Sequence, residues 1–338
     1  MRHICASIVA TLGLAVMSFA ATINVPGDHA TVYGAVGAAA DGDVIKIAAG
    51  TYHEQKIQLL NKAITIEGTV NNDGSLGTTI KGGCDPDMEA DPLFFGCPVF
   101  QIISGEGPKT ILRYLIITGG VGTDNIVDHG GGGIQITNSS PRISNCIIRN
   151  NFSWASGAGI SCINSSASIE SCLIKDNESV ATGGGLSCID NSSLIITNCT
   201  FSGNTYWANE NSGAGAAIGP YSNAQFADCI FTDNTQGNIY HGFNIDLRAG
   251  ETSFVTLENC TVCGTGDHVQ GLIAHVGENH ISDCTDDGDL DGDGDVDADD
   301  LNALHAAAGI CQSDVNHDGA TDINDLMDLI AGWNAVCP

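Results

Sequence analysis

Two segments near the end of the chain carry oxygen-bearing side chains at the spacing of calcium-binding loops. Residues 289–300 and 314–325 each have Asp or Asn at loop positions 1, 3, 5, 9 and 12, and Gly294 or Gly319 at position 6. Calcium takes about six to eight hard oxygen ligands, and glycine at position 6 allows the sharp turn that brings them together. With position 7 contributing a backbone carbonyl, the expected Ca²⁺ ligands are Asp289, Asp291, Asp293, Asp295, Asp297, Asp300, Asp314, Asn316, Asp318, Ala320, Asp322 and Asp325.

Each loop leads into an expected apolar helix, Leu301–Ala308 and Leu326–Trp333. A solvated acidic linker is the alternative, but it explains neither these helices nor the glycine that recurs at one loop position. The paired loop–helix halves, with Asp at position 12, resemble the dockerin type I module over residues 283–338. That resemblance implies a cohesin-like protein or a cell surface as partner. The loop positions that read the partner in that family, Ala298–Asp299 and Ile323–Asn324, differ between the halves.

Arg149 and Lys175 occupy the same place in two successive repeats and are the candidate catalytic residues. β-Elimination on a uronic polysaccharide needs a base to take a proton and a cation to neutralise the carboxylate. Hydrolysis needs two carboxylates that face the sugar. A solvated row of charges is the alternative interpretation of the pair. A second row, expected to point outward from strands that follow glycine clusters, contains neither an acid pair nor a base: Gln135, Ser161, Ser187 and Ala217.

Three smaller groups could also carry function. The acidic loop 84–91, expected to be closed by a disulfide from Cys84 to Cys97, could hold calcium. A turn at residues 124–129 could form an acid/base site from Asp124, Asp128 and His129, or it is a polar turn. Aromatic side chains near turns could stack on sugar rings or pack the corners: Trp154, Tyr206, Trp207, Tyr221 and Tyr240.

The elements that must position these residues follow from an internal repeat. Glycine clusters at 131–133, 157–159, 183–185 and 213–215 are each followed by a cysteine, giving Cys146, Cys172, Cys199 and Cys229, with Cys260 in a weaker fifth copy. Each period contains two or three short runs in which apolar and polar residues alternate, the pattern of strands. One period is too small to bury its apolar side, whereas stacked periods cover one another. The sequence therefore predicts an all-β chain, a right-handed parallel β-helix over residues 21–282.

Two columns of the repeat are expected to stabilise the stack. Asn151, Asn177, Asn204 and Asn234 predict an internal ladder of amides that bond to the coils above and below. The cysteine column predicts a row of small apolar side chains in the core. A row of metal-binding or redox thiols is the alternative.

The N-terminal part has the opening pattern of a known superfamily. Strand-like Thr22–Val25, a helix expected within Ala30–Ala40 that caps the open end, and Asp41–Ile47, Gly50–Tyr52 and Ile64–Gly68 resemble the pectin-lyase-like superfamily. Over residues 22–282 the resemblance implies a fold that suits acidic glycans. It implies a polysaccharide lyase or O-glycosyl hydrolase in polysaccharide catabolism, with a polysaccharide as partner. A non-catalytic cell-surface adhesin or glycan-binding structural protein is the alternative.

Composition and the first residues indicate an exported protein. Residues 1–20 combine Arg2, the apolar run Ile4–Phe19 and a small-x-small site, which is the pattern of a secretory signal peptide. No later stretch is apolar enough to span a membrane, so we expect no span in the mature chain. The formal net charge of −29 predicts repulsion from nucleic acids and favours cations such as calcium.

Overall fold

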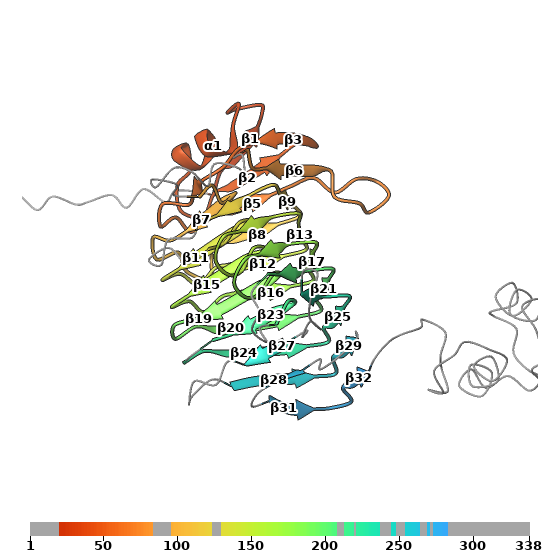
Figure 1. Ribbon diagram of the computed structural model, residues 1–338. Helices are drawn as coiled ribbons and strands as arrows, with labels where there is room; N and C mark the ends of the chain where they lie inside the picture. Colours follow the sequence, from red (N-terminus) through yellow and green to blue (C-terminus); the bar gives the residue numbers. More distant parts are fainter. Residues whose placement is uncertain are drawn as a thin grey trace, which may run out of the picture.

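The computed structural model describes residues 20–83, 96–123, 130–207, 213–219, 221–236, 245–247, 254–263, 269–270 and 273–282. The chain winds into stacked coils whose strands form parallel sheets along the molecule, with helix α1 (Val32–Ala38) at the N-terminal end (Figure 1). This confirms the predicted right-handed parallel β-helix. Among these residues no helix is long and apolar enough to cross a membrane.

Four parallel sheets account for the strands of the described residues. The ten-stranded sheet contains β1 (Thr22–Val25), β2 (Val44–Ile47), β5 (Thr65–Glu67), β8 (Ile111–Arg113), β12 (Arg142–Ser144), β16 (Ser168–Glu170), β20 (Ser193–Thr197), β24 (Asn223–Ala227), β28 (Phe254–Glu258) and β31 (Ile273–Val276). The nine-stranded sheet contains β3 (Gly50–His53), β6 (Thr78–Lys81), β9 (Ile116–Thr118), β13 (Ile147–Arg149), β17 (Leu173–Lys175), β21 (Thr200–Ser202), β25 (Ile230–Thr232), β29 (Thr261–Cys263) and β32 (His280–Ser282). The eight-stranded sheet contains β4 (Ile57–Gln58), β7 (Phe100–Ile102), β11 (Ile134–Thr137), β15 (Ile160–Ile163), β19 (Leu186–Ile189), β23 (Ala216–Ile218), β27 (Ile245–Leu247) and β30 (Val269–Gln270). The five-stranded sheet contains β10 (Val121–Gly122), β14 (Phe152–Ser153), β18 (Glu178–Ser179), β22 (Thr205–Tyr206) and β26 (Thr235–Gln236).

Corners between the sheets explain why Asn and Asp recur. At the corner before the nine-stranded sheet, Asn145, Asn198 and Asp228 have φ values of 52°, 53° and 53°, and Ser171 takes this corner at 53° in the coil between Asn145 and Asn198. Side chains of Asn and Asp tolerate this left-handed conformation because they bond to nearby backbone. Each coil can therefore turn sharply and return in register with the previous one.

The predicted asparagine ladder is confirmed. Asn151 donates through Nδ2 to Oδ1 of Asn177 at 3.0 Å, Asn177 to Asn204 at 3.0 Å, and Asn204 to Asn234 at 2.8 Å. All four residues are buried, so each amide replaces water as partner for the next coil.

A second ladder, of serines, was not predicted. Backbone N–H groups of Ser139, Ser165 and Ser192 donate to the hydroxyl of the serine in the following coil, ending at Ser222, over 3.1–3.3 Å. At the N-terminal end of the ladder, the carboxylate of buried Glu106 accepts a hydrogen bond from the Ser139 hydroxyl at 2.9 Å. The ladder satisfies buried polar groups at a corner that alternating hydrophobic residues alone would not predict.

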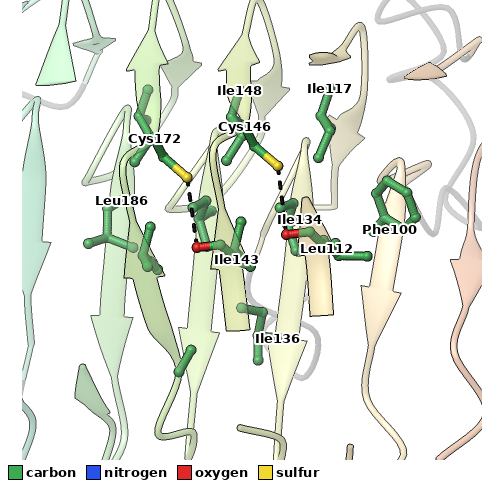
Figure 2. Packing of buried hydrophobic residues seen from close by; sticks show 14 of the residues in the cluster. Phe100, Leu112, Ile117, Ile134, Ile136, Ile143, Cys146, Ile148, Cys172 and Leu186 are labelled. Atoms are coloured by element: carbon green, nitrogen blue, oxygen red, sulfur yellow. Dashed lines mark hydrogen bonds between the residues drawn. The ribbon is translucent and has the colours of Figure 1, made fainter. Parts of the chain in front are cut away.

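The cysteine column lies in the core, as predicted. Cys146 and Cys172 point inward from neighbouring coils beside Ile148 and Ile143 (Figure 2), and all five thiols of the column are free and buried. The Cys172 thiol donates to the carbonyl of Ile143 at 3.8 Å. No cluster of three or more metal-ligating side chains occurs in the described part of the chain. Stacked core side chains therefore account for this column.

Helix α1 caps the N-terminal end, as the sequence predicts. Val32, Ala35 and Val36 are buried against the first coils. The Glu54 carboxylate accepts from the backbone N–H groups of Val32 and Tyr33 at 2.7 and 2.8 Å, which places negative charge at the helix N-terminus. The helix thereby covers an apolar end that would otherwise face water.

Candidate functional site

Arg149 and Lys175 lie side by side on the outer face of the nine-stranded sheet. They are directly paired in the register of β13 and β17. The same register continues through Thr118 on β9 to Lys81 on β6 and His53 on β3. The inward neighbour of His53 is Tyr52, and those of the other members are core isoleucines, so alternation turns the row toward solvent. We name His53, Lys81, Arg149 and Lys175 the basic row.

The basic row is only partly neutralised. Lys175 Nζ lies 3.1 Å from Asp176 Oδ2, and both side chains are more than one-third exposed, so this ion pair is worth little. Lys81 and Arg149 form no ion pair with any described residue. The row thus presents uncompensated positive charge on a chain whose net charge is −29.

Basic side chains on the ten-stranded sheet, unlike Lys81 and Arg149, form ion pairs with carboxylates of neighbouring coils. Arg113 and Lys46 both pair with Glu67, the Lys46 ammonium at 3.9 Å, and Arg142 lies 3.8 Å from Glu170. Each of these pairs joins neighbouring coils: Lys46, Glu67 and Arg113 are in register, and Glu170 lies two positions beyond the register partner of Arg142. Positive side chains on that face therefore link neighbouring coils through ion pairs, whereas Lys81 and Arg149 of the basic row make no such pair with a described residue.

The row that follows the glycine clusters is in register as expected but is closed to solvent. Gln135, Ser161, Ser187 and Ala217 are consecutive partners on the eight-stranded sheet, and each is less than one-tenth exposed. Upstream, Gln58, Gln101 and Gln135 form an amide ladder at 3.0 and 2.9 Å. The expectation that this row faces solvent is wrong, because all four side chains are closed to solvent. In register, the row continues from Ala217 to Asp246 on β27.

The turns that begin with glycine help to cover the row from Gln135 to Ala217. Gly131, with φ of 79°, runs so close to the strand that a Cβ there would lie 2.9 Å from Cα of Gln135. Gly157 approaches Ser161 in the same way at 2.9 Å. Only glycine fits this left-handed, crowded path. The recurring glycines therefore seal a face of the solenoid.

The predicted aromatic residues divide between core and surface. Tyr206 is completely buried inside the five-stranded sheet, so packing accounts for it. Tyr221 has φ of 57° at a corner and is 61% exposed. Trp154 and Trp207 directly follow β14 and β22, where both contact Phe152, a residue not predicted from the sequence. Its signal was present, because Phe152 and Trp154 are two apart and share a strand face.

Several predicted site residues lie outside the described residues. These are all twelve expected calcium ligands, from Asp289 to Asp325, together with Tyr240, the turn 124–129 and the acidic loop 84–91. Cys97 is disulfide-bonded, and its expected partner Cys84 lies outside the described residues.

Comparisons with known proteins found one family profile and several similar solved structures. Residues 52–201 match a family profile described as "Right handed beta helix region". Similar solved structures include pectin methylesterase from carrot, with 14% identity, coverage of 83% of this chain and 87% of that chain, and a TM-score of 0.48. Pectin methylesterase PemA from Erwinia chrysanthemi has 11% identity, 90% and 99% coverage, and a TM-score of 0.47. ORF18 of Geobacillus virus E2 has 15% identity, 77% and 60% coverage, and a TM-score of 0.43.

No curated protein sequence matches the chain. The profile match and the four parallel sheets together identify one architecture, the right-handed parallel β-helix.

Proposed function

We propose that this protein is an exported polysaccharide-binding β-helix that holds an acidic polysaccharide against the basic row. The observation that carries the proposal is the register of Lys81, Arg149 and Lys175 on one outward face. Successive strands are about 4.8 Å apart, so these three side chains span about 14 Å along the solenoid. A polymer with regularly spaced carboxylates can meet several of them at once.

Electrostatics favours an anionic ligand on this face. Like charges about 5 Å apart repel by roughly 1 kcal/mol in water, so an unpaired row is a cost unless a ligand neutralises it. The remaining acidic surface repels polyanions, which confines binding to this face. Each exposed contact is weak, about 0.2–1 kcal/mol, and affinity would come from several contacts along one chain.

Binding is better supported than cleavage by the basic row. Arginine keeps its proton in proteins, so Arg149 cannot serve as a general base. The Lys175 side chain forms an ion pair with Asp176. Both residues are suited to hold a carboxylate rather than to remove a proton.

We propose further that residues 283–338 form a calcium-loaded module that attaches the β-helix to a cohesin-like protein or a cell surface. The support is the repeated ligand spacing and the glycine at position 6 of each loop. Chelation should make this tail protease-sensitive while far-ultraviolet circular dichroism keeps its β signal, because unbound loop carboxylates repel one another. An unchanged cleavage pattern with chelator would exclude the module.

The binding proposal is tested with the full mature chain and polygalacturonate, using neutral pullulan as a control polymer. Affinity electrophoresis should show retardation by polygalacturonate that weakens with salt. We expect Arg149→Ala and Lys81→Ala each to weaken binding about two- to fivefold, with Lys109→Ala, an exposed lysine off the row, as matched control.

Equal retardation by both polymers, or equal effects of Lys109→Ala and Arg149→Ala, would contradict the proposal. New reducing ends or unsaturated products in the same incubations would favour the lyase or hydrolase alternative.

A further inference from the structure

An aromatic cluster lies on the outer face of the five-stranded sheet, separate from the basic row. Phe152 on β14 is in register with Glu178 on β18, which is in register with Thr205 on β22. Trp154 and Trp207 continue the same strands, because their backbone N–H groups donate to the preceding coil at 3.4 and 3.0 Å. We name Phe152, Trp154, Trp207 and Glu178 the aromatic platform.

Phe152 contacts both tryptophan rings of the platform edge to face. The centroid of Phe152 lies 4.9 Å from that of Trp154, with an interplanar angle of 82°. It lies 6.0 Å from that of Trp207, at 65°. Phe152 and Trp207 come from coils separated by the coil of Glu178, so Trp207 leans back across that coil. The rings therefore form one surface across three coils.

Glu178 gives the platform a polar centre. The indole N–H of Trp207 donates to Oε1 of Glu178. This bond holds the ring over the middle coil and orients the carboxylate, whose Oε2 accepts no hydrogen bond from the described residues. An oriented acceptor beside an apolar ring suits a ligand with a hydroxyl group next to a C–H face.

The core does not require these rings. Three of the aromatic side chains in the interior, Phe201, Phe226 and Phe231, are fully buried and contact one another. Trp207, by contrast, is 51% exposed, while Phe152 and Trp154 are half-buried. A tryptophan that packs with other rings yet leaves half its surface in water is typical of a binding surface.

We propose that the aromatic platform binds a neutral sugar ring of a polysaccharide. The C–H face of the sugar lies on Trp207 and Phe152, and a ring hydroxyl donates to Oε2 of Glu178. The carboxylate at the centre disfavours a uronate, so this site selects a different sugar from the basic row. The two sites stand on different residues, and either can fail without the other.

The test uses tryptophan fluorescence and calorimetry with cellohexaose, xylohexaose and mannohexaose as probes. The chain contains three tryptophans, and a Trp333→Phe background leaves Trp154 and Trp207 as emitters. At least one hexasaccharide should shift the emission and saturate at or below about 1 mM. Trp207→Ala should weaken binding roughly tenfold or more, and Glu178→Gln about three- to tenfold.

Two variants separate binding from folding. Trp207→Tyr retains an aromatic face and should keep part of the affinity that Trp207→Ala loses. Tyr221→Ala removes an exposed aromatic ring at another corner and should leave binding unchanged. Absence of saturable binding to all three probes overturns the proposal. It is also overturned if Trp207→Ala alters only self-association in light scattering, because the platform would then be a protein contact.

Discussion

Replacing Asn177 by Ala should remove the centre of the asparagine ladder. Asn177 is fully buried, and its side chain makes four hydrogen bonds. Oδ1 accepts from both the backbone N–H and Nδ2 of Asn151, at 3.1 and 3.0 Å. Nδ2 donates to Oδ1 of Asn204 at 3.0 Å and to the carbonyl of Ile148 at 2.9 Å. Alanine offers none of these partners and leaves a small cavity.

The expected loss of stability follows from which groups are left without partners. Asn151 Nδ2 still donates to the Ile117 carbonyl, and Asn204 Oδ1 still accepts from the backbone N–H of residue 177. The buried backbone N–H of Asn151 loses its partner outright, which costs about 1–3 kcal/mol. Each of the three further bonds lost contributes about 1 kcal/mol, so we expect a decrease in unfolding free energy of roughly 4–6 kcal/mol.

Guanidinium unfolding followed by circular dichroism measures this decrease. The matched control is Asn223→Ala, an exposed asparagine on the outer face of β24, which should change stability by less than about 0.5 kcal/mol. Because stacked coils can unfold in parts, limited proteolysis at intermediate denaturant should locate the first opening between the coils of Asn151 and Asn204. A loss below about 1 kcal/mol, or equal to that of the control, would refute the role assigned to the ladder.

Three further outcomes are expected. Gly133→Ala should destabilise by about 1–3 kcal/mol because its Cβ would lie 2.6 Å from a neighbouring carbonyl oxygen, whereas Gly37→Ala in α1, with open space around it, should be neutral or slightly stabilising in thermal melts. Hydrogen bonds from the backbone of Ala40 and Ala21 lower the pKa of Asp43 below 3.8, so its contribution to stability is present above pH 3.8 and is lost as pH falls through the lowered value. Melting temperatures from pH 6 to pH 2 should therefore fall less steeply in Asp43→Asn, and parallel curves would argue against this linkage. Burial raises the pKa of the Cys188 thiol to about 12, so this thiol should react with Ellman's reagent only after unfolding; rapid labelling of the native protein at Cys188 would contradict its burial.

Much of the stack could be read from the sequence because it depends on repetition. A strand's inward and outward positions alternate, and one coil must cover the next, so the period alone places Asn151, Asn177 and Cys172 inside and aligns Arg149 with Lys175. The serine ladder obeys the same rule. Ser139, Ser165, Ser192 and Ser222 recur with the period, and this signal could have been found.

Contacts made across the turns were decided only by the tertiary structure. Alternation assigns a side chain to a face of its strand, but the path of the following turn determines whether that face is covered, as Gly131 covers Gln135. It also determines which rings meet: Phe152 and Trp207 are 55 positions apart and join because Trp207 leans across the coil between them. Periodicity in the sequence therefore determined the scaffold and the alignment of Arg149 with Lys175, whereas the strand register added Lys81 and His53 to the basic row. The aromatic platform and the closed face depend on turn geometry, which no local pattern specifies.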